Sequence, residues 1–329
     1  MTRKASALHG MQPRTPHVSV HGAFLHLALS AVLLFAVVSC GGGEGKKTPA
    51  DAAVDTTRSV RGMDVGSGTV VDSLQADMTG DGITEAILLS LSDSLMQDPL
   101  LQASFDRVDI YDSSQRPPLR LFFDVIEDGR RAETGDVTGD GFSDLIVETD
   151  AGGNNPITSR GMHLYGRDAD GAVTLLFFIS SGAPELRDLN GDGVSEVLVS
   201  DQFWGMMAHS EVIVFTRDVY AFDGRAYAHA NKAFSAYFER HLSEHMRRFE
   251  KEKTLPHLGD ESRLRLYRSA AELLAWSFAR GGAARAARLW RSERQYLREE
   301  LFEEQYDDLS AFVDEVRAME RSRQNGRVS

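Results

Sequence analysis

Cysteine is almost absent from this sequence, because Cys40 is the only one among 329 residues. A single cysteine excludes an intramolecular disulfide, so the fold must depend on core packing or on bound metal. Lysine is missing from residues 61–226, which hold 29 Asp and Glu against 11 Arg, a net charge of −18. Residues 227–329 are nearly balanced, with 17 acidic and 19 basic residues. The acidity is therefore local, which argues against nucleic-acid binding and for cation binding in the central segment.

Long apolar runs are also missing, with one exception from Ala23 to Val38. This run is shorter than a typical membrane-spanning helix. It follows a segment that contains Arg3, Lys4 and Arg14 and no acidic residue, and small residues come after it. A basic segment, a short apolar core and small residues form the layout of a secretory signal peptide. We therefore predict that residues 1–39 are a signal peptide and that the protein is exported.

The end of this segment, residues 37–41 (VVSCG), resembles the lipobox of bacterial lipoproteins. The resemblance implies that Cys40 is acylated, becomes the first residue after cleavage and anchors the protein to a membrane, with Gly41 indicating the outer membrane. Each buried CH₂ contributes about 0.8 kcal/mol, so several acyl chains give stable anchoring. Secretion with an unmodified Cys40 is the alternative. Residues 40–62 are small, polar and aperiodic, which is typical of a flexible tether.

Two patterns divide the rest of the chain. In residues 63–226, short runs rich in Val, Ile, Leu and Phe alternate with Gly, Asp and Asn clusters, which predicts antiparallel β-strands joined by turns. The predicted strands include residues 86–89, 107–111, 119–123, 145–147, 173–178 and 211–215. In residues 227–329 the apolar residues recur at helical spacing, so we predict a helical region there.

Local signals place the ends of the predicted helices. The first helix covers the apolar stripe from Phe234 to Phe249. Asp260 is expected to cap the second helix, and the pair Gly281-Gly282 is expected to end it. We predict a third helix over about residues 283–306 and a fourth over about residues 309–323.

One internal repeat occurs three times in the β region. Residues 77–85 (DMTGDGITE), 136–144 (DVTGDGFSD) and 188–196 (DLNGDGVSE) share oxygen-bearing side chains at positions 1, 3, 5 and 9. Ca²⁺ takes six to eight oxygen ligands, and alternate residues of a tightly wound loop can direct their oxygens at one centre. Glycine at position 6 allows the sharp turn, and the backbone carbonyl at position 7 can supply a further ligand. The repeats therefore predict three calcium sites.

These loops differ from EF-hands. An EF-hand needs a bidentate Glu at position 12, whereas the repeats have Leu88, Val147 and Val199 there, and an apolar run follows position 9 directly. The pattern resembles the FG-GAP/VCBS repeats of integrin-like β-propellers, in which calcium loops join the strands of a blade. The resemblance implies a mainly β region with about three propeller-like blades, followed by a C-terminal α-helical unit. Closed propellers have four to eight blades, so the array is expected to be open or incomplete.

The resemblance implies Ca²⁺ as the cofactor and assigns ligands position by position. They are Asp77, Thr79, Asp81, the Ile83 carbonyl and Glu85; Asp136, Thr138, Asp140, the Phe142 carbonyl and Asp144; and Asp188, Asn190, Asp192, the Val194 carbonyl and Glu196. The family prefers Asp or Asn at position 3, so the third loop, with Asn190, is expected to bind calcium best. The alternative is that these loops are Asp/Gly turns held by side-chain to backbone hydrogen bonds without metal.

Signatures of catalysis are scarce, and we expect no enzyme activity. The sequence has no nucleophile elbow, phosphate loop or dinucleotide fingerprint. Residues 241–245 match H-x-x-E-H, which on a helix would place His241 and His245 around Zn²⁺, with Glu244 as general base and Glu320 as a further ligand. The alternative is that both histidines border the buried face of the helix.

These patterns together predict a non-enzymatic, lipid-anchored, calcium-binding protein that acts as a binding or adhesion module on the cell envelope. Its ligand is expected to be a protein or a carbohydrate, and nucleic acid is not expected. Residues Phe203, Trp204, Met206 and Met207 are either a contact surface or part of the core. The alternative functions are an envelope scaffold whose helices bind a protein partner, and a zinc-dependent hydrolase.

Overall fold

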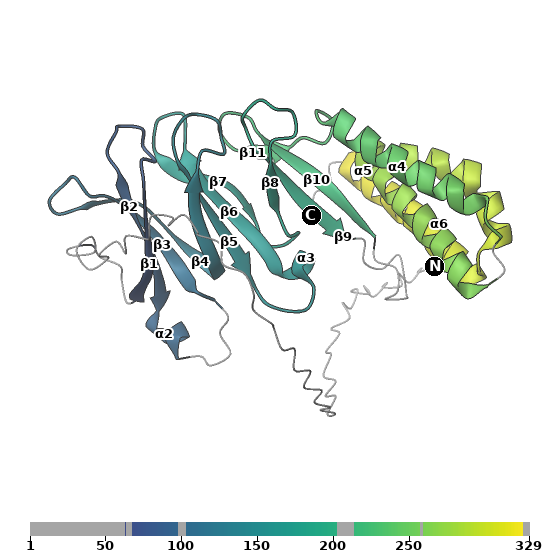
Figure 1. The fold of residues 1–329 in the computed structure, drawn as a ribbon, viewed down its shortest axis with the longest axis horizontal. Helices are drawn as coiled ribbons and strands as arrows, with labels where there is room; N and C mark the ends of the chain where they lie inside the picture. Colours follow the sequence, from purple (N-terminus) through teal and green to yellow (C-terminus); the bar gives the residue numbers. More distant parts are fainter. Residues whose placement is uncertain (1–62, 64–67, 98–102, 203–213, 257–258, 325–329) are drawn as a thin grey trace, which may run out of the picture. The chain divides into compact units, whose positions relative to one another are not determined.

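The computed structural model describes residues 63, 68–97, 103–202, 214–256 and 259–324 (Figure 1). The predicted signal peptide, Cys40 with its tether and the cluster at residues 203–207 lie outside the described residues. The described residues form antiparallel β-sheets followed by C-terminal helices, as the sequence patterns predict. Within these ranges, no helix is both long and apolar enough to cross a membrane.

The larger sheet has seven antiparallel strands that lie in chain order (Figure 1). They are β1 (Gly68–Ala76), β2 (Glu85–Ser92), β3 (Phe105–Asp112), β4 (Leu119–Gly135), β5 (Asp144–Asp150), β6 (Arg160–Arg167) and β7 (Val173–Ile179). Each strand pairs only with its neighbours in the chain, so every connection is local. Two short helices, α2 (Asp93–Met96) and α3 (Pro156–Ser159), lie in the connections. The sheet is open, with β1 and β7 at its edges.

Strand β4 is unusually long and changes its partner part-way. Its first part pairs with β3 and its last part with β5, and the change falls at Gly129. The preceding residue, Asp128, has a φ of 56°, a left-handed conformation that Asp tolerates better than most residues. A Cβ on Gly129 would lie 2.6 Å from ring carbons of Phe105 and from its carbonyl oxygen. This position therefore needs glycine, and the register with β5 shifts directly after it.

The second sheet has four antiparallel strands in the order β11-β10-β9-β8. They are β8 (Glu185–Arg187), β9 (Glu196–Gln202), β10 (Phe215–Phe222) and β11 (Tyr227–His229). The sheet thus extends past residue 226, the predicted end of the β region, because the Tyr227 ring packs against Phe177 and Phe222. The strand predicted at residues 211–215 begins at Phe215 in the described part of the chain, and the polar residues Arg217 and Asp218 concealed its continuation.

Three helices complete the described chain: α4 (Ser235–Lys253), α5 (Asp260–Glu300) and α6 (Glu303–Gln324). The predicted break at Gly281-Gly282 is a kink inside α5, where both glycines leave helical geometry. Asp260 is the first helical residue rather than the cap, because Ser262 Oγ accepts the Gly259 N–H at 3.3 Å. The predicted third helix is too long by about two turns. It ends at Glu300 because Leu301 is extended and only 8% exposed.

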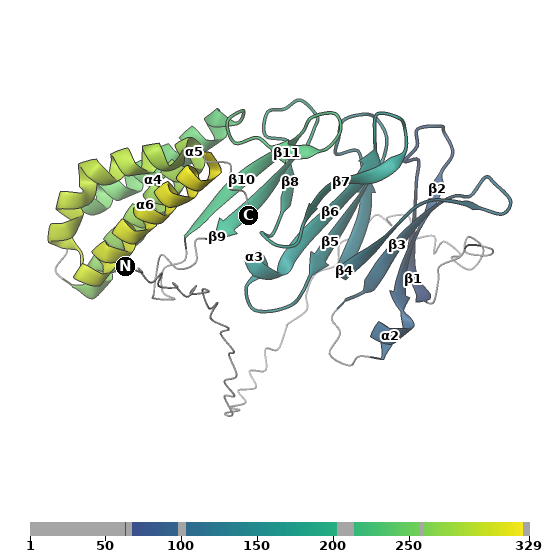
Figure 2. The ribbon, with the colours of Figure 1, turned by 180° about the vertical axis from the view of Figure 1, so that it is seen from behind.

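Apolar side chains gather in three clusters along the molecule. The first lies within the larger sheet and includes Ile87, Val108 and Ile126. The second joins the two sheets, through Leu164 and Leu176 on one and Val197, Val199 and Tyr227 on the other. The third joins Leu198, Val214 and Val219 of the second sheet to the helices, with Phe238, Leu274 and Trp290 among its members. Figure 2 shows the helices beside β9 and β10, and α5 contacts β10. The helices therefore share a core with the sheet.

Candidate functional site

The three repeated loops connect β1 to β2, β4 to β5 and β8 to β9, and all three have one hydrogen-bond scheme. In each loop, Oδ1 of the first Asp accepts the N–H of the glycine at position 4, over 2.6–2.7 Å. Its Oδ2 accepts the N–H of the glycine at position 6, over 3.0–3.1 Å. Both glycines of every loop have positive φ, which glycine adopts without steric cost. The repeated letters therefore correspond to one repeated conformation.

A buried carboxylate lies beneath each loop. Glu85, Asp144 and Glu196, at position 9, are only 1–2% exposed. Each accepts the N–H of the residue at position 2, at 2.7–2.9 Å, and in the first two loops it also accepts the hydroxyl of the threonine at position 3. Burial raises the pKa of Asp144 and of Glu196, because removal from water disfavours the charged form. A bound cation would relieve this cost.

The first loop has the donor set that best fits a divalent cation. Asp77, Asp81 and Glu85 each bring a carboxylate oxygen within 4.8 Å of the other two. Among the described residues, no other set of three or more Asp, Glu, His or Cys side chains has ligand atoms this close to one another. Two hydrogen bonds leave Asp77 with acceptor capacity, since an ionised carboxylate has about four lone-pair sites. Hard cations such as Ca²⁺ prefer such oxygen ligands. The carboxylate positions thus make the first loop a candidate cation site, while the preference of calcium for the third loop, based on Asn190, stays a prediction.

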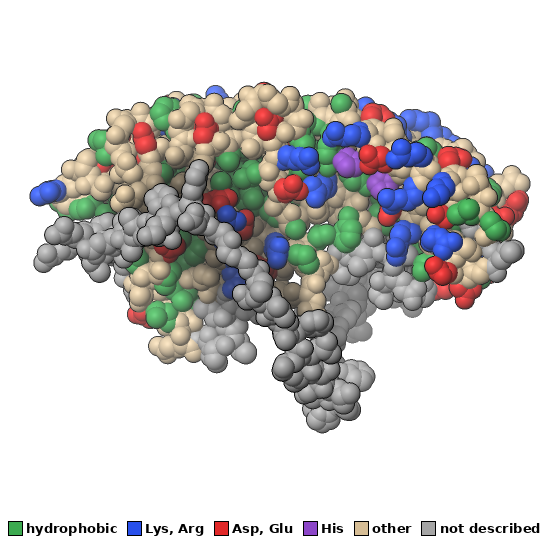
Figure 3. Space-filling view, in the orientation of Figure 1, with side chains coloured by type: hydrophobic (Ala, Val, Ile, Leu, Met, Phe, Trp, Pro, Cys, Tyr) green, Lys and Arg blue, Asp and Glu red, His purple; other side chains and the backbone are tan. Residues whose placement is uncertain are grey.

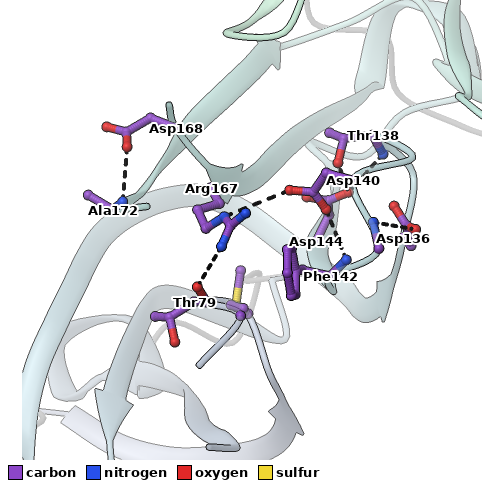
Figure 4. A network of polar contacts seen from close by, with 12 residues as sticks. Thr79, Asp136, Thr138, Asp140, Phe142, Asp144, Arg167, Asp168 and Ala172 are labelled. Atoms are coloured by element: carbon purple, nitrogen blue, oxygen red, sulfur yellow. Dashed lines mark hydrogen bonds and ion pairs between the residues drawn. The ribbon is translucent and has the colours of Figure 1, made fainter. Parts of the chain in front are cut away.

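The second loop has a fixed cation beside it (Figure 4). Arg167, the last residue of β6, places Nε 3.9 Å from Asp140 Oδ2 and its guanidinium 4.0 Å from the centre of the Phe142 ring. The same side chain donates from Nη1 to the carbonyl oxygen of Thr79, 2.9 Å away. A guanidinium at this distance opposes a second cation at Asp140. The guanidinium therefore partly balances the charge of Asp140 in the second loop.

In the third loop the position-3 side chain is hydrogen-bonded to the residue at position 5. Asn190 Nδ2 donates to Asp192 Oδ2 at 2.8 Å, and Asn190 Oδ1 accepts the Asp192 N–H at 2.9 Å. The pKa of Asp188 is lowered by the N–H groups of Gly193 and Gly191, which stabilise its charged form. The same Asp-to-glycine hydrogen bonds occur in the first two loops, so they do not distinguish the third loop from them.

Neighbouring loops contact one another through the serine at position 8. Ser143 donates its N–H to the carbonyl of Asp77, at position 1 of the first loop, at 3.1 Å, and Ser195 donates to that of Val137, at position 2 of the second loop, at 2.9 Å. A Cβ on Gly80 would lie 2.5 Å from the Phe142 ring. The repeat offers one signal for this packing, which is the combination of glycine at position 4 with an apolar residue at position 7 in every copy. We assigned position 7 only a carbonyl ligand, so sequence reasoning missed its side-chain role.

The larger sheet also carries a cavity of about 410 Å³, lined by residues of β4, β5, β6 and β7 and by neighbouring loop residues. Its polar lining includes Asp124, Glu127 and Asp128 from β4 and His163 from β6. Val125, Leu175 and Phe178 form apolar parts of the wall. The sequence patterns did not identify this site, because no strand was predicted over residues 160–167 and no motif joins the residues of β4 to those of β6.

A chain of three hydrogen-bonded side chains lies beside this cavity. Tyr165 donates its hydroxyl hydrogen to Asp124 Oδ2 at 2.9 Å, and His163 Nδ1 lies 3.1 Å from the same hydroxyl oxygen. Burial lowers the pKa of His163, while the charge of Asp124 partly opposes that shift. Burial also raises the pKa of Tyr165, with Asp124 adding to the shift. The imidazole is therefore neutral at neutral pH, and the tyrosine keeps its proton.

The two histidines of the H-x-x-E-H motif lie on one aromatic surface. The rings of His241 and His245 stack on Trp276, with centroids 4.7 and 5.5 Å from it. His245 Nδ1 lies 3.2 Å from Glu272, and His241 Nδ1 lies 3.9 Å from Glu244. Figure 3 shows histidines at the surface over α4, surrounded by Lys and Arg side chains. In the ranges that the structure describes, these histidines belong to no group close enough to share a metal, and the Glu320 side chain lies outside the described atoms.

No protein-family model matches the chain, and no curated protein matches it.

Proposed function

We propose that this protein is a non-enzymatic, calcium-binding repeat protein that is anchored by lipid at Cys40 and acts as a binding module on the cell envelope. The observation that carries the proposal is the first loop, in which three carboxylates share one centre. The repetition of its hydrogen-bond scheme in two further loops supports a repeated site rather than a chance cluster of acids.

We infer that the β region consists of three propeller-like units of four strands. The first would run from β1 into β4, the second from the last part of β4 to β7, and the third from β8 to β11. Three observations support this division: each unit has its loop between its first two strands, β4 changes partner at Gly129, and the serine at position 8 of the second and third loops donates its N–H to the preceding loop. The third unit packs its face against the helices, which then act as a cover for the end of the array.

Calcium-dependent melting of the purified protein tests the proposal. Ca²⁺ binds only the folded state, so an excess of about 100 times the Kd adds about 2.7 kcal/mol to the free energy of unfolding. The melting temperature should rise with Ca²⁺ and fall on addition of a chelator, and metal analysis should find calcium. A melt that is unchanged by chelator would reject the proposal and leave the turns as purely hydrogen-bonded structures.

A pair of matched variants locates the effect. Glu85→Gln removes one charge from the first loop and should abolish most of the calcium-dependent rise in melting temperature. Asp168→Asn is the control, because Asp168 also accepts backbone N–H groups in a turn, from Asp170 and Ala172, but belongs to no close carboxylate group. Its calcium response should equal that of the wild type.

The membrane part of the proposal has its own test. Incorporation of labelled fatty acid into the protein in bacterial cells should be lost in Cys40→Ser, and the variant should leave the membrane fraction. Retention in that fraction without label would show that Cys40 is not the anchor.

A further inference from the structure

We propose that the cavity beside β4 and β7 binds an organic cation, an ammonium group carried on a small apolar body. This inference is independent of calcium binding, because none of the three repeated loops contributes a residue to the cavity lining. The ammonium group can come from a free amine or from a lysine side chain of a partner protein.

The charge of the lining determines the sign of the ligand. Asp124, Glu127 and Asp128 all line the cavity, and the described lining residues include no Lys or Arg. An anion would therefore meet three carboxylates with no cation to balance them. A cation gains from all three, and more strongly here than in bulk water because the cavity walls are partly apolar.

His163 adds a hydrogen-bond acceptor of defined orientation. The side chain lines the cavity although the residue is only 7% exposed. Because the Tyr165 hydroxyl hydrogen points to Asp124, the hydroxyl oxygen must accept the hydrogen of His163 Nδ1. Nε2 is then the unprotonated nitrogen, and it has no hydrogen-bond partner in the part of the chain that the structure describes. An acceptor in a cavity lining can take a hydrogen bond from a ligand, and an ammonium group has three hydrogens to donate.

The apolar wall distinguishes an organic cation from a metal ion. Val125 is 65% exposed and Phe178 is 54% exposed, and both line the cavity. The Phe178 ring also lies against His163, with centroids 4.5 Å apart. An exposed aromatic face attracts an ammonium group and also covers an apolar body. The carboxylates of this cavity do not form a group tight enough to share a metal ion, a property that the described residues show only at the first loop.

The backbone also holds an acidic residue at this wall. Asp128 has positive φ, which costs energy for a residue with a Cβ and recurs at binding sites. It stands where β4 changes partner at Gly129, next to Glu127 in the chain. Both acidic residues line the cavity at this point of the strand.

Calorimetric titration of the purified protein with phenethylamine tests the proposal. We expect saturable binding, and no binding of 2-phenylethanol or phenylacetate, which keep the ring but replace the ammonium group by a neutral or an anionic one. Glu127→Gln with Asp128→Asn should weaken binding by at least about tenfold, the loss expected for charged hydrogen bonds. Glu133→Gln, on the same strand but outside the cavity, should leave it unchanged.

The other outcomes of the titration test the proposal, the source of the ammonium group and the independence from calcium. Equal binding of amine and alcohol, binding that survives the double variant, or no saturation up to about 10 mM amine would overturn the proposal. If Nα-acetyl-lysine amide binds more tightly than phenethylamine, the ammonium group comes from a lysine side chain of a partner protein. If phenethylamine binds more tightly, it comes from a free amine. The titration is repeated with chelator: amine binding that persists while the calcium response is absent refutes only the calcium proposal.

Discussion

Arg167 Nη1 donates to the carbonyl oxygen of Thr79 across 2.9 Å, and so ties the end of β6 to the first repeated loop. The guanidinium also stacks on Phe142 of the second loop. One side chain therefore holds two loops in their relative positions. We predict that Arg167→Gln lowers the free energy of unfolding by about 1–3 kcal/mol, from the lost charged hydrogen bond and the lost contact with the ring. Urea unfolding at fixed pH measures this difference.

The matched control for this variant lies on the same strand. Arg160 pairs with Asp150 at 3.5 Å, but 62% of its side chain is exposed, and exposed ion pairs contribute little. Arg160→Gln should therefore change the free energy of unfolding by less than about 1 kcal/mol. Equal losses in the two variants would show that Arg167 does not join the loops.

Gly166 gives the second prediction, because the structure leaves no room for a side chain there. A Cβ would lie 2.2 Å from Asp144 Oδ1 and 2.6 Å from Leu176 Cδ1. Gly166→Ala should lower the free energy of unfolding by about 1–3 kcal/mol or more, since the buried carboxylate must move from its hydrogen bonds. Gly135→Ala is the control, with no heavy atom within 4 Å of the added Cβ. If chemical denaturation shows the same stability for both variants, the close approach at Asp144 is not present in solution.

Much of this fold follows from local patterns. Apolar runs such as residues 86–89 and 145–147 predicted β2 and β5 because both faces of these strands are buried, and the repeated loops fixed where each begins. Gly281-Gly282 predicted the break in α5 because glycine alone readily adopts the φ of 69° seen at Gly282. Strand β6 was missed. Its sequence places His163 and Gly166 among apolar residues, and their burial depends on partners elsewhere in the chain.

The candidate sites divide in the same way. The first loop could be predicted because all its ligands fall within nine residues of sequence. The cavity could not, because Asp124 and His163 are 39 positions apart and meet only through strand pairing and through the Tyr165 hydroxyl. The contact of Phe142 with Gly80 also depends on how one loop stands beside the next, which no single repeat specifies.

The third prediction concerns pH. Burial lowers the pKa of His163 in the folded state, so the unfolded chain takes up the proton first as the pH falls. The free energy of unfolding is therefore unaffected by this group above the ordinary histidine pKa of about 6.5, and it falls as the pH decreases below that value and through the lowered folded-state pKa. His163→Gln should show a smaller fall over this range, measured by urea unfolding at a series of pH values.

The other titratable groups change the free energy of unfolding equally in the wild type and in His163→Gln. Burial also lowers the pKa of His241, which contributes a fall of the same sign to wild type and variant alike. The groups that face His163 are Asp124 and the Tyr165 hydroxyl, whose pKa is raised so that it keeps its proton throughout. Identical pH profiles for the wild type and His163→Gln would contradict the burial of a neutral imidazole at this position.

The last prediction concerns Asn231, which joins the second sheet to the helices. The residue is 7% exposed, and its Oδ1 accepts the N–H of Val219 in β10 at 2.7 Å. Its Nδ2 donates to Asp218 at 2.7 Å and reaches the carbonyl of Ala279 in α5 at 3.4 Å. Asn231→Ala leaves the buried Val219 N–H without its acceptor, which should cost about 1–3 kcal/mol of unfolding free energy.

Hydrogen exchange shows whether this loss reaches both elements. If the helices and the second sheet unfold together through their shared core, Asn231→Ala should lower the protection of amides in β10 and in α5 by the same factor. Asn154→Ala, at an exposed loop position, should change neither, because substitutions of this kind usually stay within about 0.5 kcal/mol. Lower protection in β10 alone, with α5 unchanged, would mean that the helices fold independently. The helical region would then be free to act as a separate binding unit and not as the cover of the sheet.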